Sequence, residues 1–371
     1  MIGAERLLAA CRREPVDATP VWYMRQAGGS LPRYQQLRER HSVMEIARTP
    51  ELCAEVTSVA AETLGVDGAV LFADVMLPVE AMGVELELTA AGPVIASPVR
   101  SAADVERLRT VDVASDLGFV LEAIRLVRAR LAGRAAVIGI CGAPFTLAAY
   151  LIEGGPSRDQ AVARAFMRRE PAAWHALMEK LTIVAVAYVA AQVAAGAEVI
   201  QVFDSWAGSL SAADYTTFVA PYSHRVLAAA PAAAGTPMVH FATGSGHLLR
   251  ELAAAGGTVV GVDWRIPLGD AWATIRDAVG PRPIQGNLDP SVLLAGWHAT
   301  ENAARAVLDQ AAGRPGHIFN LGHAAPRETD PQILRDLAAF VHESTARAAA
   351  VNAAAVNAAA VTHPAEAAAR A

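Results

Sequence analysis

Eight short apolar runs alternate with longer helical patterns along this chain, and this alternation restricts its possible folds more than any other feature. The runs occupy residues 20–24, 69–72, 136–140, 199–203, 237–241, 258–262, 283–285 and 317–321. They lack the alternation of apolar and polar residues that marks a strand with one wet face, so they are typical of strands buried on both sides. Eight such units predict an α/β fold, a single (β/α)8 TIM barrel, because doubly wound sheets usually stop at about five to seven strands.

Two segments depart from this rhythm. Residues 84–99 alternate apolar and polar side chains on either side of Ala91-Gly92-Pro93, which predicts a hairpin inserted after strand two. Residues 346–371 consist mostly of alanine and can bury little surface, so we expect a helical or disordered tail without an assigned function. The predicted organisation is therefore one barrel domain over residues 1–345 and a low-complexity, Ala-rich C-terminal tail over residues 346–371.

The longest apolar run, residues 181–203, includes Gln192, Gly196 and Glu198. It predicts a helix that ends near Gly196 and is followed by a strand, in preference to a membrane span. The N-terminal segment interleaves arginines with glutamates and shows no export signal. Three cysteines without metal-binding spacing fit a reducing compartment. We therefore expect a cytoplasmic protein with no membrane partner.

Charge composition limits the classes of ligand and reaction. The net charge of -6 and the pI near 5.9 argue against a nucleic-acid partner. Among the 31 basic residues Lys180 is the single lysine, and it lies inside a helical pattern, which disfavours Schiff-base and pyridoxal-phosphate chemistry. An anionic substrate must therefore be bound by locally placed arginines.

Residues at the carboxyl ends of the strands build the ligand site of a barrel. Here these positions hold Arg25-Gln26-Ala27-Gly28, Ala73-Asp74, residues 141–147 together with Tyr150, Asp204-Ser205-Trp206-Ala207-Gly208 and Gly322-His323. An arginine that follows a strand is often only a surface ion pair, but its planar fork of donors also grips a carboxylate in bidentate fashion. The combination favours a carboxylate-bearing substrate.

Taken together, these segments resemble the uroporphyrinogen decarboxylase family over about residues 4–345. The resemblance lies in residues 20–28, Phe72-Ala73-Asp74, residues 142–147, residues 203–208, Gly286-Asn287-Leu288-Asp289-Pro290 and Asn320-Leu321-Gly322-His323. It implies a cytosolic homodimer with one barrel per subunit. It also implies conversion of uroporphyrinogen III to coproporphyrinogen III in haem biosynthesis, by loss of carbon dioxide from four acetate arms without a cofactor or metal.

The resemblance also carries site residues over to this sequence. It places the catalytic carboxylate on Asp74 and the start of the substrate loop on Arg25, and we expect Arg25 to anchor a carboxylate arm and to assist proton delivery. The expected substrate contacts are Arg25, Gln26, Ala27, Gly28, Gly29, Asp74, Tyr150, Ser205 and His323. Ser205 is also expected to cap the helix after strand four. Asp204, Asp263 and Asp289 follow strands as well, and we interpret them as structural hydrogen-bond acceptors.

Two loops depart from the family pattern. The family has arginine where this chain has Gly29 and glutamate where it has Arg33, which suggests the hypothesis that Arg33 takes a substrate carboxylate. After His323, residues 324–327 lack the glycine of the family pattern, which leaves the shape of that loop open.

Three alternatives remain at this stage. A barrel methyltransferase that acts between cobalamin and thiols would need a His-x-Cys zinc pair after strand five, where this chain has His240-Phe241-Ala242. A non-catalytic tetrapyrrole-binding homologue is suggested by Gly29. Nucleotide binding at residues 244–249 is weakly supported, because the run lacks the third glycine of the dinucleotide pattern.

Overall fold

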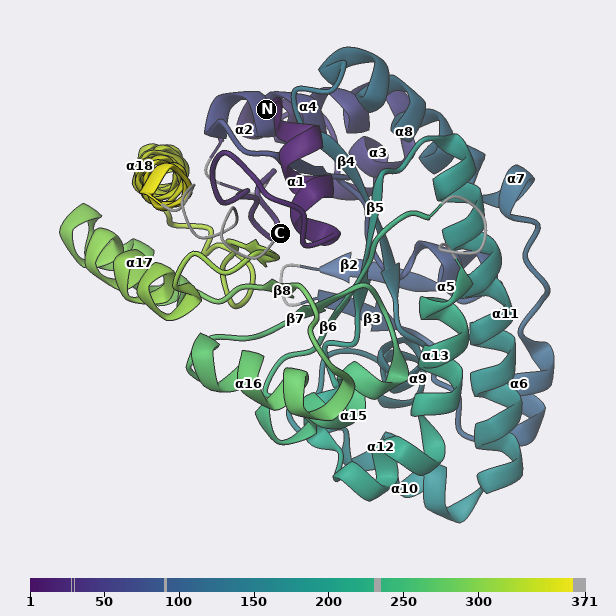
Figure 1. Cartoon of the computed structure of the whole chain (residues 1–371). Helices are drawn as coiled ribbons and strands as arrows, with labels where there is room; N and C mark the ends of the chain where they lie inside the picture. Colours follow the sequence, from purple (N-terminus) through teal and green to yellow (C-terminus); the bar gives the residue numbers. More distant parts are fainter. Residues whose placement is uncertain (28, 30, 90–91, 230–234, 363–371) are drawn as a thin grey trace.

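A curled parallel sheet forms the centre of the molecule (Figure 1). The computed structural model describes residues 1–27, 29, 31–89, 92–229 and 235–362. Seven strands pair in the order β1-β4-β5-β6-β7-β8-β9, all parallel to their neighbours. Their bounds are β1 (Gly68–Val70), β4 (Ala136–Gly142), β5 (Val199–Phe203), β6 (Met238–Phe241), β7 (Val259–Gly261), β8 (Ile284–Gln285) and β9 (His317–Ile318).

The first predicted strand, residues 20–24, is reduced to a single parallel bridge between Val21 and Phe319. This short segment still connects the two edges of the sheet. On one side the Asp67 amide donates to the Val21 carbonyl at 2.7 Å, and on the other the Trp22 amide donates to the Phe319 carbonyl at 3.3 Å. The prediction was wrong about its length, because the chain turns away immediately afterwards, but the segment occupies the eighth position of the ring.

Asp67 holds this closing segment in place. Its buried carboxylate accepts from the Val21 amide at 2.7 Å, from Arg6 Nη1 at 2.6 Å and from His342 Nε2 at 2.7 Å. A buried carboxylate needs such donors to offset the loss of its hydration. One side chain at the amino end of the barrel thus joins the first segment to an N-terminal and a C-terminal helix.

Eight helices surround the sheet, and each contacts the next until the last contacts the first (Figure 1). In ring order they are α4 (Pro50–Leu64), α8 (Gly118–Leu131), α11 (Pro171–Ala195), α13 (Ala220–Leu227), α15 (Leu249–Ala255), α16 (Leu268–Val279), α17 (Trp297–Ala311) and α18 (Pro331–Thr362). This closed helical layer around a parallel sheet is the arrangement of a (β/α)8 barrel, and it confirms the predicted fold class.

The helix α11 and the strand β5 confirm the interpretation of residues 181–203. The helix ends before Gly196, whose φ of +112° suits a residue without a side chain. The amide of Gln192 accepts from the Ile140 amide at 3.0 Å and donates to the Ile140 carbonyl at 2.9 Å, so this polar group is satisfied in the core. In the described part of the chain α11 is the single helix long and apolar enough to cross a membrane, and half of its most hydrophobic window is buried.

The predicted hairpin is confirmed as the antiparallel pair β2 (Leu86–Thr89) and β3 (Gly92–Ile95) after β1, packed beside α9. The remaining helices are shorter than the ring helices α8, α11 and α17. They are α1 (Gly3–Cys11), α2 (Pro32–Arg38), α3 (Val43–Arg48), α5 (Leu77–Ala81), α6 (Ala102–Arg107), α7 (Val113–Asp116), α9 (Pro144–Glu153), α10 (Ala161–Arg169) and α12 (Ala212–Phe218). The described residues also form three 3-10 turns: η1 (Ala207–Ser209), η2 (Gly246–Leu248) and η3 (Pro290–Ala295).

The C-terminal helix α18 runs through the predicted start of the tail at residue 346 and ends at Thr362. Alanine is the strongest helix former, which accounts for the continued helix. The described part of the Ala-rich segment is thus helical, while the division of the chain at residue 345 stays a prediction.

Candidate active site

Arg25 has a left-handed backbone at the turn after the Val21 bridge, with φ of +58°. This conformation costs a residue with a side chain about 1 kcal/mol and persists only where neighbouring groups enforce it. Here the Gln26 amide donates to the Tyr23 carbonyl at 3.1 Å, and the Ala325 amide donates to the Met24 carbonyl at 3.2 Å. The exposed Arg25 side chain is therefore presented by a fixed backbone at the carboxyl end of the barrel.

Gln26 and Ala27 are buried and hold the loop in position. The Gln26 Oε1 atom accepts from the Tyr23 amide at 3.0 Å, and its Nε2 atom donates to the Gly68 carbonyl at 2.9 Å. Both ends of the amide are therefore engaged by backbone groups, so a substrate contact at these positions would fall to the main chain. Gly28, also expected to contact substrate, lies outside the described residues.

Asp74 follows β1 and keeps one carboxylate oxygen unbound. Its Oδ1 atom accepts from the Met76 amide at 2.8 Å, whereas no hydrogen bond among the described residues uses Oδ2. Burial raises the pKa of Asp74, while the Met76 amide and the positive charge of Arg25 act in the opposite direction. Asp74 and Arg25 thus lie within electrostatic reach of each other, as the sequence predicted.

Tyr150, on α9, lies in the same electrostatic environment. Its ring meets Trp206 edge to face, with the centroids 5.5 Å apart. Burial raises the pKa of the Tyr150 phenol, the Asp74 charge raises it further, and the Arg25 charge lowers it. The Tyr150 phenol thus packs against Trp206 and lies within electrostatic reach of Asp74.

His323 is exposed on the loop after β9, with its ring centroid 6.2 Å from that of Trp264. Partial desolvation by the surrounding protein lowers the pKa of His323, and the positive charges of Arg25 and Arg265 lower it further. Arg25 therefore acts electrostatically on Asp74, Tyr150 and His323, which come from three different strand ends. The structure brings these four predicted residues together.

Ser205 follows β5, and the prediction that it caps the next helix is wrong. The turn η1 begins two residues later, at Ala207, with Trp206 at its N-cap position and no side-chain cap. The Ser205 carbonyl accepts from Thr243 Oγ1 at 2.6 Å, and no hydrogen bond of the described residues uses its hydroxyl. The hydroxyl thus remains available for the predicted substrate contact.

The three other strand-end aspartates are structural acceptors, as expected. Asp204 is buried and accepts from Thr146 Oγ1 at 3.3 Å and lies 3.4 Å from His240 Nε2. Asp263 accepts from the backbone amide of Gly244 and from Arg265, and Asp289 caps η3 by accepting from the Ser291 amide at 2.9 Å. The Gly244 amide is thus engaged within the protein and does not cradle a phosphate.

Side chains that the methyltransferase alternative would require are bound or inert. The second ring nitrogen of His240 lies 3.3 Å from the Leu252 carbonyl, so both nitrogens face protein partners. Burial raises the pKa of Cys11, Cys53 and Cys141 to about 12, which keeps the thiols protonated at neutral pH. Across the described ranges no group of three His, Cys, Asp or Glu residues is arranged to hold a metal ion.

Arg33 does not fill the place left by Gly29. Its Nε atom binds Glu55 Oε1 on α4 at 2.6 Å, and its Nη1 atom donates to Gln36. A side chain built at Gly29 would instead meet the Cβ and Cγ atoms of Arg327 at 3.7 Å. The structure thus places Arg327 beside the altered position and gives no support to the hypothesis for Arg33.

Trp264 and Arg265 belong to the same end of the barrel but were not predicted as site residues. They follow Asp263 directly after β7, and the guanidinium of Arg265 lies 3.8 Å from the centroid of the Trp264 ring. Their position after a strand is the signal in the sequence that could have identified them.

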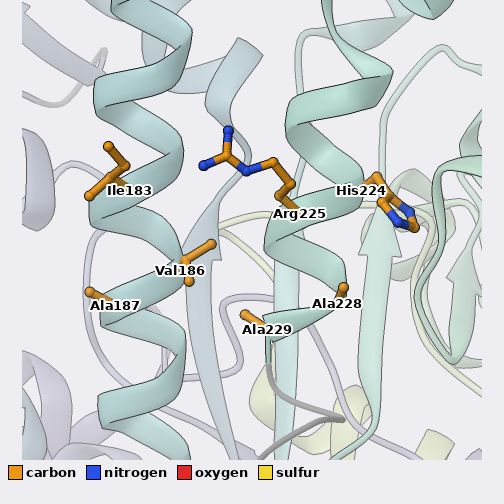
Figure 2. A pocket seen from close by; sticks show the side chains of 7 residues that line it. All are labelled: Ile183, Val186, Ala187, His224, Arg225, Ala228 and Ala229. Carbon is orange, nitrogen blue, oxygen red and sulfur yellow. The ribbon is translucent and has the colours of Figure 1, made fainter.

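Figure 2 shows a hollow on the outside of the barrel, between α11 and α13. Its lining is mostly apolar, and its two polar side chains already have partners. His224 Nδ1 lies 2.9 Å from the Ala255 carbonyl, and Arg225 binds Glu179 at 2.5 Å. The other lining residues are alanine, valine and isoleucine, whose side chains offer no donor to a polycarboxylate.

Comparison with known proteins gives consistent matches over most of the chain. Residues 3–344 match the family model described as "Uroporphyrinogen decarboxylase (URO-D)". A uroporphyrinogen decarboxylase of Roseiflexus sp. (strain RS-1) is 49% identical over 346 residues, covering 92% of this chain and 99% of the relative. One from Koribacter versatilis (strain Ellin345) is 47% identical over 339 residues, covering 91% and 95% respectively.

Among solved structures, a methyltransferase from Methanosarcina mazei superposes with a TM-score of 0.76 at 20% sequence identity. It covers 92% of this chain and 99% of its own. A likeness at this level of identity shows a shared barrel fold and does not extend to the reaction.

Proposed function

The chain belongs to the uroporphyrinogen decarboxylase family, and we propose that Asp74, close to Arg25 at the carboxyl end of the barrel, is the group on which its reaction depends. The activity is the decarboxylation of uroporphyrinogen in tetrapyrrole biosynthesis, which makes the protein a carboxy-lyase. The observation that supports the role of Asp74 is its unbound Oδ2 atom within the electrostatic reach of Arg25.

Decarboxylation of an acetate arm requires a group that accepts the electron pair left behind. When an acetate arm loses carbon dioxide, the bond between its methylene and carboxylate carbons breaks and leaves an electron pair. Prior protonation of the pyrrole at a ring carbon creates a cation that accepts this pair as an exocyclic double bond. A proton then adds to the methylene to give a methyl group, and the ring carbon loses the first proton. One proton thus replaces each carbon dioxide.

Asp74 stabilises the cationic ring as it forms. A carboxylate about 4 Å from a cation, at an effective dielectric of about 20, attracts it by about 4 kcal/mol. Because about 1.4 kcal/mol corresponds to tenfold in rate, this attraction supplies roughly a thousandfold. The Met76 amide orients one oxygen and leaves the other to face the pyrrole N–H groups.

The other residues bind the carboxylate arms. Arg25 anchors one arm near the reacting ring and assists proton delivery, and the rigid turn that holds it reduces the entropy lost on binding. Tyr150, Ser205 and His323 donate hydrogen bonds to other arms. The backbone of residues 26–29 completes the substrate loop.

Finer features rest on membership of the family alone. They are the choice of uroporphyrinogen III, the formation of coproporphyrinogen III by four decarboxylations, the independence from cofactors and metals, a homodimer and a cytoplasmic location. Light scattering of the purified protein tests the dimer directly.

An anaerobic assay tests the function as a whole. Purified protein, treated with a chelator, is incubated with uroporphyrinogen III while carbon dioxide and the tetrapyrrole products are quantified. We expect four molecules of carbon dioxide per molecule of coproporphyrinogen III. Substrate binding without release of carbon dioxide would identify a non-catalytic homologue, and activity restored only by added metal would contradict the cofactor-independent reaction.

A further inference from the structure

Arg265 is held rigidly at the carboxyl end of the barrel, directly after β7. Its Nη1 atom binds Asp263 Oδ2 at 2.7 Å, and its backbone amide donates to Asp263 Oδ1 at 3.0 Å. Its guanidinium lies 3.8 Å from the centroid of the Trp264 ring. A charged group that is fixed by an ion pair and by stacking loses little conformational freedom when it binds a ligand.

The ion pair is asymmetric in exposure, and this asymmetry determines what it offers to a ligand. The Asp263 side chain is 2% exposed and directs its oxygens to protein donors, whereas the Arg265 side chain is 52% exposed. No hydrogen bond among the described residues uses Nε or Nη2 of Arg265. The pair therefore presents hydrogen-bond donors to solvent while its carboxylate is hidden.

Arg265 lies on the His323 side of the site. The loop after β9 approaches so closely that a side chain at Gly322 would overlap the Trp264 backbone, and Trp264 in turn packs against the His323 ring. The charge of Arg265 acts on His323, whereas the charged groups that act on Asp74 are Arg25 and Glu80. Together with the contacts of Trp264, this assigns Arg265 to the part of the site formed by the loop after β9.

A tetrapyrrole with eight carboxylates is wider than the reach of one arginine, so rings away from Asp74 require their own binding groups. We propose that Arg265 binds a carboxylate arm on a ring remote from the one that reacts, through the donors that Asp263 and Trp264 leave free. This inference rests on the proposed function, because it assumes the same substrate. It makes Arg265 a binding residue whose removal weakens affinity and spares chemistry.

The test compares three variants in steady-state kinetics with uroporphyrinogen III. Arg265→Gln removes the charge, and Arg265→Lys keeps a charge without the fork. The matched control is Arg314→Gln, because Arg314 also stacks over a tryptophan, 4.3 Å from the Trp272 centroid, but precedes β9 at the opposite end of the barrel. We expect KM to rise about tenfold in Arg265→Gln, about threefold in Arg265→Lys and less than twofold in the control. The kcat values should stay within about twofold of the wild type.

Ionic strength provides a readout that a merely structural role would not change. Because salt screens charge attraction, KM of the wild type should rise with salt, and Arg265→Gln should show a smaller rise. A KM within twofold of the wild type, or a fall in kcat at constant KM, would overturn the proposal. If the wild type released no carbon dioxide, the proposed function would fail. Quenching of the protein's tryptophan fluorescence by oxidised uroporphyrin would then measure binding and test Arg265 separately. We expect weaker binding by Arg265→Gln, and equal binding would refute the proposal.

Discussion

The positive charge of Arg25 acts to lower the pKa of Asp74 at the carboxyl end of the barrel, yet no ion pair within 4 Å joins the two side chains in the described part of the chain. A direct ion pair would neutralise both groups before substrate arrived. Because the two groups do not pair, Arg25 can bind a carboxylate arm while Asp74 faces the nitrogen of the pyrrole ring that carries this arm. In the proposed mechanism, this separation lets Arg25 bind an arm of the substrate while Asp74 stabilises the reacting ring.

Replacing Asp74 by asparagine should stabilise the protein at neutral pH. Burial raises the folded-state pKa of Asp74 above its unfolded value, so the ionised form costs folding free energy at any pH above the folded pKa. The cost disappears as the pH falls below the unfolded value. Thermal unfolding as a function of pH should therefore show a higher Tm for Asp74→Asn at neutral pH and convergence in acid. A variant less stable than the wild type at neutral pH would contradict this account.

Replacing Arg25 by asparagine should lower activity without lowering the stability of the protein. Asparagine tolerates the left-handed backbone better than arginine, so we expect the free energy of unfolding to stay equal or to rise by up to about 1 kcal/mol. Loss of the guanidinium should lower kcat/KM about a hundredfold, which corresponds to about 2.7 kcal/mol. Chemical denaturation and steady-state kinetics measure the two effects. Retained kcat/KM would remove Arg25 from the mechanism.

Replacing Arg33 by alanine should leave catalysis unchanged. The guanidinium binds Glu55 and not the open site, so KM for uroporphyrinogen should stay within twofold of the wild type. The half-exposed ion pair contributes about 0.5 kcal/mol to stability, and a small decrease in Tm is the expected result. A fivefold rise in KM would restore the hypothesis that Arg33 binds a carboxylate.

His323 should titrate below the ordinary histidine range in the free protein and closer to it in the complex. Desolvation and two neighbouring arginines lower its pKa, and a bound carboxylate opposes them by stabilising the imidazolium. Nitrogen-15 NMR of histidine-labelled protein, with and without oxidised uroporphyrin, measures both values. An unchanged or lower pKa in the complex would indicate that no carboxylate reaches His323.

Strand positions and the cluster of site residues could be predicted from the sequence because both depend on local order. Apolar runs mark strands, and the residues after parallel strands meet at one end of a barrel, so Asp74 and Tyr150 could be placed at that end from the sequence, while their roles came from the family resemblance. The sequence could not show contacts between residues that are far apart along the chain. Asp67 binds the Val21 amide from 46 residues away and holds the bridge in place, and Glu55 on α4 binds Arg33 on α2.

Side-chain orientation was the second limit. The sequence does not reveal that the amide of Gln26 faces the backbone, or that the turn after β5 begins too late for Ser205 to cap it. The sequence likewise does not reveal that Arg265 is exposed while its partner Asp263 is buried. Each of these facts follows from how neighbouring loops pack, and residue type alone does not encode it.

The most direct test of the mechanism is anaerobic release of carbon dioxide from uroporphyrinogen III by wild type and Asp74→Asn. Asparagine retains the size of the side chain and an acceptor for the Met76 amide but carries no charge. We predict that kcat falls roughly a thousandfold in the folded variant, in line with the attraction of about 4 kcal/mol assigned to the carboxylate. A folded Asp74→Asn variant with kcat within tenfold of the wild type would show that the charge of Asp74 is not what stabilises the reacting ring.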